Sequence, residues 1–239
     1  MPFSPLSIGN CAAWFDASDS TTITQDASSN VSQWNDKTGN GLNAIVNTAQ
    51  ERGAPTYNGS GAIKYVSLET GQALVIQSFP YNTAWSVFSC MCNVSLDSRW
   101  YISPYNDKSI VLMGMSMGAN KIFPELVGTG TGDLTGSHIE YTTAENTNGI
   151  GAYLYYRDGT MQTSNNTYYD ASAGTVNLGI GANGNANYEA GGTYYPFEII
   201  IYNQYLGDTD RQKVEGYLAW KWGLQASLPS GHPYLSAAP

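Results

Sequence analysis

The stretch Phe197-Glu-Ile-Ile-Ile-Tyr202 decides the fold class of this chain. Successive residues of a β-strand point to opposite faces of the sheet, and here apolar side chains fall on both faces. A strand of this kind lies in the interior of a sheet that is covered on both sides. The sequence therefore predicts a layered β-protein in which residues 197–202 form a central strand.

Shorter apolar or alternating segments recur before this strand, between clusters of Gly, Asn, Asp and Ser. This pattern is typical of antiparallel sheets joined by turns. In residues 153–161, Asp158 and Gly159 are suited to the two positive φ angles of a type I′ turn, so we expect a hairpin there. The other predicted strands are residues 11–16, 62–66, 73–76, 86–94, 109–117, 138–143, 151–157 and 175–180.

After the central strand the sequence predicts one amphipathic helix over residues 209–222. Thr209 and Gln212 have the spacing of a capping box, and Gly223 suits the left-handed position that ends a helix. We interpret the helix as covering one end of its own sandwich, with a partner or a membrane surface as the alternative. The apolar positions at helical spacing are Val214, Tyr217, Leu218 and Trp222.

Composition limits the class of protein further. A hydrophobic share of 42% is enough for a sizeable core, whereas charged residues make up only 12%, about half the usual share. The net charge of −9, with no cluster of Lys and Arg, predicts that neither nucleic acid nor an anionic membrane is a partner. No apolar run is long enough for a transmembrane helix, which needs roughly 18 residues.

A chain of 239 residues is long for one domain, but single β-sandwiches of roughly 200–250 residues are common. We predict one sandwich over residues 11–235, preceded by an extended arm (residues 1–10) and followed by a short tail (residues 236–239). Cys90 and Cys92 lie two residues apart on one predicted strand, near the outer limit for a disulfide. We therefore interpret both, and Cys11, as free thiols.

Stretches near both ends of the chain resemble the concanavalin A-like lectin/glucanase superfamily, specifically its laminin-G-like domains from bacterial, viral and phage surface proteins. Residues 13–20 lead into Trp34-Asn-Asp-Lys-Thr-Gly-Asn-Gly41, which is similar to the family's Trp-x-Asp-x-Ser-Gly-Asn-Gly turn. Residues 214–224 and Leu228-Pro-Ser-Gly-His-Pro-Tyr234 resemble its closing helix and tail. The resemblance implies a jelly-roll-like sandwich of two antiparallel sheets, with loops at one rim as the usual ligand site.

The Gly-Asn-Gly turn leaves two interpretations open. Asp36 can accept backbone N–H groups in a purely structural turn, which is the interpretation that we favour. The superfamily often carries calcium, and oxygen ligands suit this hard cation. We therefore expect no required cofactor, with a calcium site as the alternative, formed by Asp16, Asp19, Asp36 and Asn40.

Glycoside hydrolases also belong to this superfamily, and they use paired carboxylates. Their strand motif Glu-x-Asp-x-x-Glu is absent from the sequence. Glu140 and Glu198 stand alone, and we interpret both as solvated sheet positions; His138 and Glu140 share one strand face at a spacing that is weak evidence for catalysis. The sequence therefore predicts that the protein is not an enzyme.

Two loops combine aromatic rings with short polar side chains, a mixture that is typical of concave ligand sites. We predict that these loops bind a glycan or a protein partner, with simple coverage of the sandwich edge as the alternative. Residues 98–108 contribute Trp100, Tyr101, Tyr105, Asn106 and Asp107, and residues 183–195 contribute Asn185, Asn187, Tyr188 and Tyr194.

Three functions follow from these features. The preferred one is a structural or decoration protein on the surface of a virus or phage particle, because the chain has free thiols, a single domain and no export signal. Its partners would be other capsid or tail proteins, further copies of the chain, or cell-surface glycans. The second is an extracellular or cell-surface carbohydrate-binding module of a polysaccharide-degrading system. A glucanase-like hydrolase is a distant third.

Overall fold

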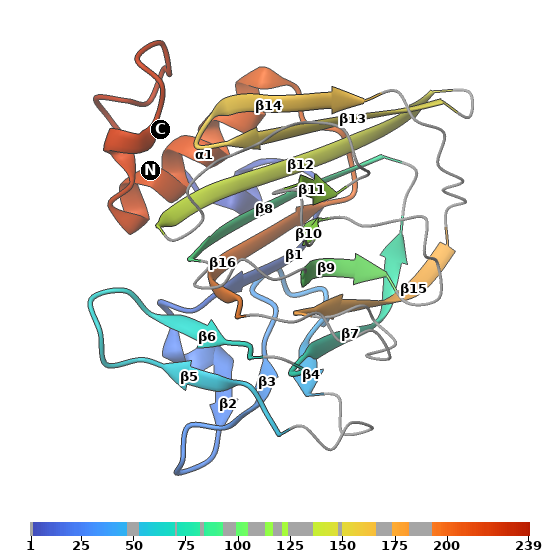
Figure 1. Ribbon diagram of the computed structural model, residues 1–239, viewed down its shortest axis with the longest axis vertical. Helices are drawn as coiled ribbons and strands as arrows, with labels where there is room; N and C mark the ends of the chain where they lie inside the picture. Colours follow the sequence, from blue (N-terminus) through green and yellow to red (C-terminus); the bar gives the residue numbers. More distant parts are fainter. Residues whose placement is uncertain are drawn as a thin grey trace.

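The structure is a computed structural model, and it describes eleven stretches of the chain. These are residues 2–46, 53–69, 71–81, 84–92, 99–104, 113–116, 121–123, 136–147, 150–165, 174–181 and 193–239. Two large antiparallel sheets form a sandwich, and one α-helix covers the outer face of one of them (Figure 1). This arrangement confirms the predicted all-β sandwich with a C-terminal helix.

The first sheet has six strands, and its centre is the segment that decided the fold class. The strand order is β1 (Cys11–Asp16), β16 (Tyr195–Tyr202), β8 (Trp85–Cys92), β12 (Ser137–Thr147), β13 (Ile150–Arg157) and β14 (Thr160–Asn165). β16 therefore has a hydrogen-bonded neighbour on each side, antiparallel in both cases. Asp158 and Gly159 have φ angles of 49° and 76°, as the predicted hairpin turn between β13 and β14 requires.

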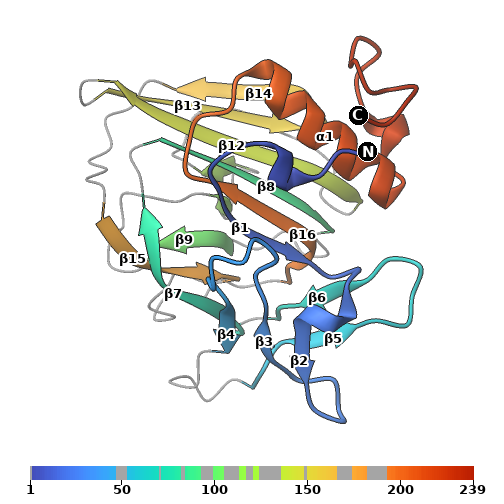
Figure 2. The ribbon, with the colours of Figure 1, turned by 180° about the vertical axis from the view of Figure 1, so that it is seen from behind.

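The second sheet has eight strands. Their order is β11 (Lys121–Phe123), β10 (Met113–Ser116), β9 (Arg99–Pro104), β15 (Gly174–Ile180), β7 (Leu74–Tyr81), β4 (Ala44–Val46), β3 (Val31–Trp34) and β2 (Ile23–Gln25). A small third sheet pairs β5 (Thr56–Asn58) with β6 (Tyr65–Ser67). This small sheet lies at the opposite end of the molecule from the helix (Figures 1 and 2).

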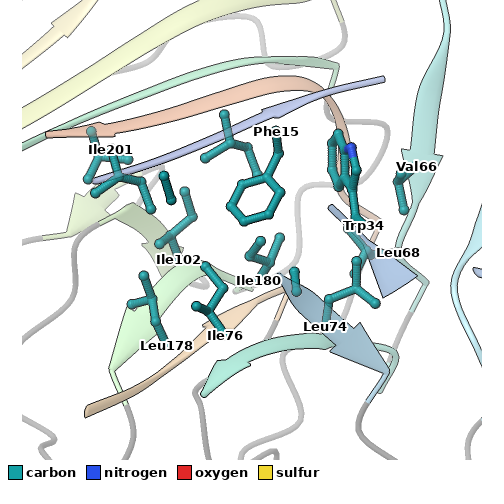
Figure 3. Packing of buried hydrophobic residues seen from close by; sticks show 14 of the residues in the cluster. Phe15, Trp34, Val66, Leu68, Leu74, Ile76, Ile102, Leu178, Ile180 and Ile201 are labelled. Carbon is teal, nitrogen blue, oxygen red and sulfur yellow. The ribbon is translucent and has the colours of Figure 1, made fainter. Parts of the chain in front are cut away.

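The main core fills the space between the two large sheets. Phe15 and Ile201 of the six-stranded sheet point toward Ile76, Leu178 and Ile180 of the eight-stranded sheet (Figure 3). All five side chains are fully buried, as period-2 alternation predicts for the inner face of a sandwich.

A second core lies on the other face of the six-stranded sheet, beneath α1 (Asp208–Trp222). Ile200 and Tyr202 from β16 are buried together with Val214, Leu218 and Trp222 from the helix. β16 is therefore covered on both faces, which confirms the prediction from its sequence. Among the described residues, no helix is long and apolar enough to span a membrane.

The start of α1 differs from the prediction. Gly207 is the N-cap and supplies no side-chain hydrogen bond, so the capping box from Thr209 is wrong: Thr209 already lies in the first turn. The C-terminal end of α1 agrees with the prediction, since Gly223 takes a left-handed conformation with φ 74°. A side chain at Gly216 would meet Cβ of Tyr234 at 2.5 Å, so this glycine allows the C-terminal tail to pack on the helix.

The N-terminal segment also differs from the predicted extended arm. Pro5–Ser7 forms a 3₁₀ turn (η1), and Ile8 is buried in the core beneath α1. The ring of Phe3 lies 5.9 Å from that of Tyr217 on the helix. Apolar side chains therefore hold this segment against the domain. The three cysteines form no disulfide, as predicted: Cys90 is buried, and Cys11 and Cys92 are half-buried.

We predict that Trp222→Ala lowers the free energy of unfolding by about 3–5 kcal/mol, the range for removing a large buried aromatic side chain. Chemical denaturation measures this change. Trp220→Ala on the same helix is the control, because Trp220 is 39% exposed and its loss should cost far less. Equal effects of the two substitutions would show that Trp222 is not part of the core.

Candidate functional site

A groove with a volume of about 840 Å³ lies over the small sheet of β5 and β6. Its lining is polar and aromatic, and most of the side chains carry hydroxyl or amide groups. Its lining comes from residues 25–29, from β5 and β6 with the turn between them, from Glu69 and from the start of β16. The lining includes Tyr57, Asn58, Gly59, Tyr65, Ser67, Glu69 and Tyr195.

The register of β5 and β6 explains which side chains face the groove. Tyr57 pairs with Val66, and both side chains are buried in the main core. Asn58 pairs with Tyr65, so these two share the opposite face of the small sheet and are only half-buried. Alternation along two short strands thus places one aromatic ring and one amide on the groove side.

Two stacked tyrosines form the floor of the groove. The rings of Tyr65 and Tyr195 lie 5.0 Å apart with an interplanar angle of 28°. The side-chain amide of Asn58 donates to the Tyr65 hydroxyl at 2.8 Å, and the Phe197 ring lies 6.4 Å from that of Tyr65. These contacts fix the ring pair before any ligand arrives, which reduces the entropic cost of binding.

A carboxylate stands beside the ring pair. Oε1 of Glu69 accepts hydrogen bonds from the hydroxyls of Tyr195 and Ser67, each at 3.4 Å. The Glu69 side chain is exposed. Burial and the negative charge of Glu69 raise the pKa of Tyr195, which keeps its hydroxyl protonated as a donor.

Another part of the lining is the loop of residues 26–30, which its own hydrogen bonds hold in place. The Asp26 carboxylate accepts from the backbone N–H groups of Ser28 and Asn30, at 2.8 and 2.9 Å. The Ser29 carbonyl accepts from the N–H of Tyr57 at 2.9 Å and so ties the loop to β5. At Gly59, a Cβ would lie 2.5 Å from the Tyr57 ring, so the glycine lets the chain pass this ring closely.

The predicted ligand-binding loops are only partly described. Tyr105, Asn106, Asp107, Asn185, Asn187 and Tyr188 lie outside the described residues, as do the side chains of Trp100 and Tyr101 in β9. Tyr194 is fully buried, and its hydroxyl lies 2.7 Å from that of Ser89. Its assignment to a solvent-facing site is therefore wrong. The next residue, Tyr195, faces the groove, because neighbouring strand residues point to opposite sides.

The predicted calcium ligands do not surround one point. Nζ of Lys37 lies between two of them, 2.9 Å from Asp16 and 3.1 Å from Asp19. The Asn40 amide donates to the Ala12 carbonyl, and the described part of the chain contains no group of three or more acidic, His or Cys side chains that could hold a metal ion. Asp36 accepts from the backbone N–H groups of Trp14 and Thr38, the geometry expected of a structural turn.

Glu198 is not a solvated sheet position, as the sequence had predicted, but a fully buried carboxylate. Its oxygens accept from the indole N–H groups of Trp14 at 2.7 Å and Trp222 at 2.8 Å. The Tyr217 hydroxyl also donates to it, and the Lys221 ammonium lies 2.7 Å away. Burial raises the pKa of this group. These partners give Glu198 a structural role between sheet and helix.

Glu140 is buried as well, and its partners differ from those that the sequence suggested. It accepts from Nε of Arg157 at 2.8 Å and from the Tyr155 hydroxyl. The imidazole of His138 bonds instead to Asp158, at 2.8 Å. The prediction of a solvated Glu140 is therefore wrong, and the acid–imidazole pair forms with a different acid.

Comparisons with known proteins show that other proteins share this fold. No protein-family model and no curated protein matches this sequence. A Trypanosoma rangeli sialidase is similar in structure, with a TM-score of 0.56 and 13% identity over 90% of this chain and 33% of the sialidase. Domain 4 of AbnA, a GH43 extracellular arabinanase from Geobacillus stearothermophilus, was solved with arabinotriose; it has a TM-score of 0.59 and 16% identity over 84% of this chain and 96% of that domain.

The binding domain of Paraclostridial Mosquitocidal Protein 1 is also similar, with a TM-score of 0.53 and 10% identity over 87% of this chain and 52% of that one. The chain thus spans about a third of the sialidase and about half of the mosquitocidal binding domain. At these identities the matches show the fold alone: a β-sandwich that occurs in carbohydrate-active proteins.

These matches correct the prediction that the protein is not an enzyme. The same fold occurs in part of a sialidase chain and in domain 4 of a GH43 arabinanase, so the fold gives no ground for excluding an enzyme. The prediction rested on a missing pair of carboxylates on one strand. That motif is not general, because sialidases use a tyrosine nucleophile instead. The absence of one motif from the sequence was too narrow a test.

We predict that neither EDTA nor added calcium shifts the melting temperature of this protein. The Lys37 ammonium lies between Asp16 and Asp19, and the Lys221 ammonium also contacts Asp16, so a metal cation would have to displace them. Thermal unfolding in EDTA and in increasing calcium tests this, because a ligand of the native state raises the melting temperature as its concentration rises. A calcium-dependent increase that Asp36→Asn abolishes would restore the metal-site interpretation.

Proposed function

We propose that this chain is a carbohydrate-binding module of a polysaccharide-degrading system and that the groove over β5 and β6 holds the glycan. The observation that carries this proposal is the stacked pair Tyr65–Tyr195 with a carboxylate and an amide at its edge. We further propose that its β-sandwich is of the concanavalin A-like, laminin-G-like type, on the strength of the turn at residues 34–41 and the tail at residues 228–234.

The chemistry of the groove suits a sugar. A pyranose or furanose ring has apolar C–H faces and a rim of hydroxyl groups. Aromatic rings pack against the former, and the short polar side chains exchange hydrogen bonds with the latter. The volume of about 840 Å³ falls within the range of roughly 300–1,000 Å³ typical of small-ligand sites, and so suits an oligosaccharide.

The fold comparisons support this function over a role in a virus particle. Two of the matched proteins are a sialidase and an arabinanase, and the arabinanase domain was solved with an oligosaccharide. The third is the binding domain of a mosquitocidal protein. The proposed location is extracellular or on the cell surface, where polysaccharides are encountered.

We predict that Tyr65→Ala and Tyr195→Ala each weaken glycan binding at least about tenfold, which corresponds to about 1.4 kcal/mol. The reason is the loss of one half of the stacked ring pair. A glycan array identifies the ligand, and isothermal titration calorimetry of wild type and variants measures the affinities.

Tyr205→Ala is the matched control, because Tyr205 is an exposed tyrosine (37%) that does not line the groove. It should bind like wild type. Melting curves of all the variants separate lost binding from lost folding. Wild-type affinity in both groove variants, with the glycan still bound, would place the site elsewhere, such as the loop around Trp100. No binding of wild type to any glycan would refute the proposed function.

A further inference from the structure

We infer that Tyr65 donates a hydrogen bond to the glycan in the groove, and that Asn58 is a positioning residue that sets the direction of this bond. The groove then recognises a sugar by an acceptor oxygen placed against the Tyr65 hydroxyl. This inference rests on the proposed function and adds the kind of ligand atom that the groove selects.

The pairing of β5 with β6 puts these two residues side by side. Asn58 is the last residue of β5, Tyr65 is the first residue of β6, and the two are register partners. The side chains of directly opposite strand residues share one face, with Cβ atoms about 4.5–5.5 Å apart. Both residues line the groove, and both are half-buried. The bond between them therefore belongs to the surface that a ligand meets.

Ring contacts fix the place of the Tyr65 hydroxyl. The Tyr195 ring stacks on the Tyr65 ring at 5.0 Å, and the Phe197 ring lies 6.4 Å from it. A ring held in this way keeps its oxygen in one place, but the proton can still turn about the C–O bond to suit its partners. The direction of the O–H group is the freedom that remains.

Asn58 decides this direction. Its amide Nδ2 donates to the Tyr65 hydroxyl oxygen at 2.8 Å, so the Tyr65 oxygen is the acceptor in this bond. A tyrosine hydroxyl carries one proton, and that proton is not used in accepting. It points to another side of the oxygen, and a ligand in the groove can supply the acceptor there. Hydrogen bonds in such a chain polarise one another, so the amide makes the hydroxyl a stronger donor.

The other tyrosine of the stacked pair has a different role. The Tyr195 hydroxyl donates to Oε1 of Glu69 at 3.4 Å, so its proton is used in a bond within the protein. Tyr195 thus presents a ring face to a sugar, whereas Tyr65 presents a ring face and an O–H donor. The difference follows from their neighbours, an amide beside Tyr65 and a carboxylate beside Tyr195.

A sugar has many oxygens that this donor can reach. Ring and linkage oxygens carry no proton and can only accept, and hydroxyl oxygens can accept as well as donate. A donor at Tyr65 suits all of these atoms. If the bond with Asn58 were reversed, the Tyr65 oxygen would turn its lone pairs to the ligand, and ring or linkage oxygens would be repelled.

Asn58→Asp makes this reversal with almost no change in size. The carboxylate that it introduces is ionised at neutral pH, since the ordinary pKa of Asp is about 3.9, and it can only accept. The Tyr65 hydroxyl must then donate to it, so the bond is kept and its direction is reversed. We expect glycan binding at least about tenfold weaker, with an unchanged melting temperature.

Asn58→Ala separates direction from placement. It removes the bond but leaves the Tyr65 proton able to turn toward a ligand, so this variant should bind more tightly than Asn58→Asp. If Asn58 only held the ring in place, the order would be the opposite, because Asn58→Asp keeps a bond to the hydroxyl and Asn58→Ala does not.

Tyr65→Phe keeps the ring and removes the donor. We expect binding to weaken about three- to tenfold, as for the loss of one hydrogen bond. Tyr205→Phe is the matched control, because Tyr205 is exposed and does not line the groove, and it should bind like wild type. In the Tyr65→Phe background, Asn58→Asp should cost less than about twofold, since no hydroxyl is left to redirect. An effect of the added charge alone would persist in that background.

Isothermal titration calorimetry measures these affinities with arabinotriose, cellotriose and mannotriose, and with any further oligosaccharide that the glycan array identifies. Three results would each overturn the inference and leave the proposed function standing. They are wild-type affinity in Asn58→Asp or in Tyr65→Phe, weaker binding in Asn58→Ala than in Asn58→Asp, and an equal loss from Asn58→Asp with and without the Tyr65 hydroxyl.

Melting curves of all the variants show which of them fold. If Asn58→Asp does not fold, Tyr65→Phe against Tyr205→Phe still decides whether the Tyr65 hydroxyl donates to the sugar. No binding of wild type to any of these oligosaccharides, together with none on the glycan array, refutes the proposed function itself.

Discussion

The buried carboxylate of Glu198 is the interaction on which the arrangement of sheet and helix depends. It lies in β16, is fully buried, and is bonded to Trp14 of β1 and to Tyr217, Lys221 and Trp222 of α1. An unpaired charge in this place would be strongly destabilising, because burial removes the water that would otherwise hydrate it. The carboxylate therefore fixes how the helix sits on the six-stranded sheet.

The candidate groove is built at the start of the same strand. β16 begins at Tyr195, which faces the groove, and reaches Glu198 three residues later. Leu68 and Tyr194 exchange two backbone hydrogen bonds, at 3.0 and 2.9 Å, and thereby join the end of β6 to the start of β16. The ring pair of Tyr65 and Tyr195 is consequently placed by the sheet and does not depend on a free loop.

Several of the few charged residues of this chain form ion pairs inside the protein. Arg211 and Glu215 are buried on α1 and pair at 2.6 Å, and His232 of the C-terminal tail lies 3.2 Å from Glu215. Lys37 and Lys221 both contact Asp16. These ion pairs join the helix to the C-terminal tail and to β1.

Local periodicity in the sequence determined the fold class, the helix and the hairpin at Asp158-Gly159, because these depend on neighbours along the chain. The apolar side chains on both faces of residues 197–202 predicted a strand that is covered on both sides. Gly223 predicted the end of the helix. The partners of Glu140 and Glu198 were decided by tertiary structure, since they come from distant strands and from α1. Tertiary structure also decided the groove. Tyr65 and Tyr195 are far apart in sequence, and only the pairing of β5, β6 and β16 brings their rings together. Alternation along the strand could not by itself show whether Tyr194 or Tyr195 faces solvent.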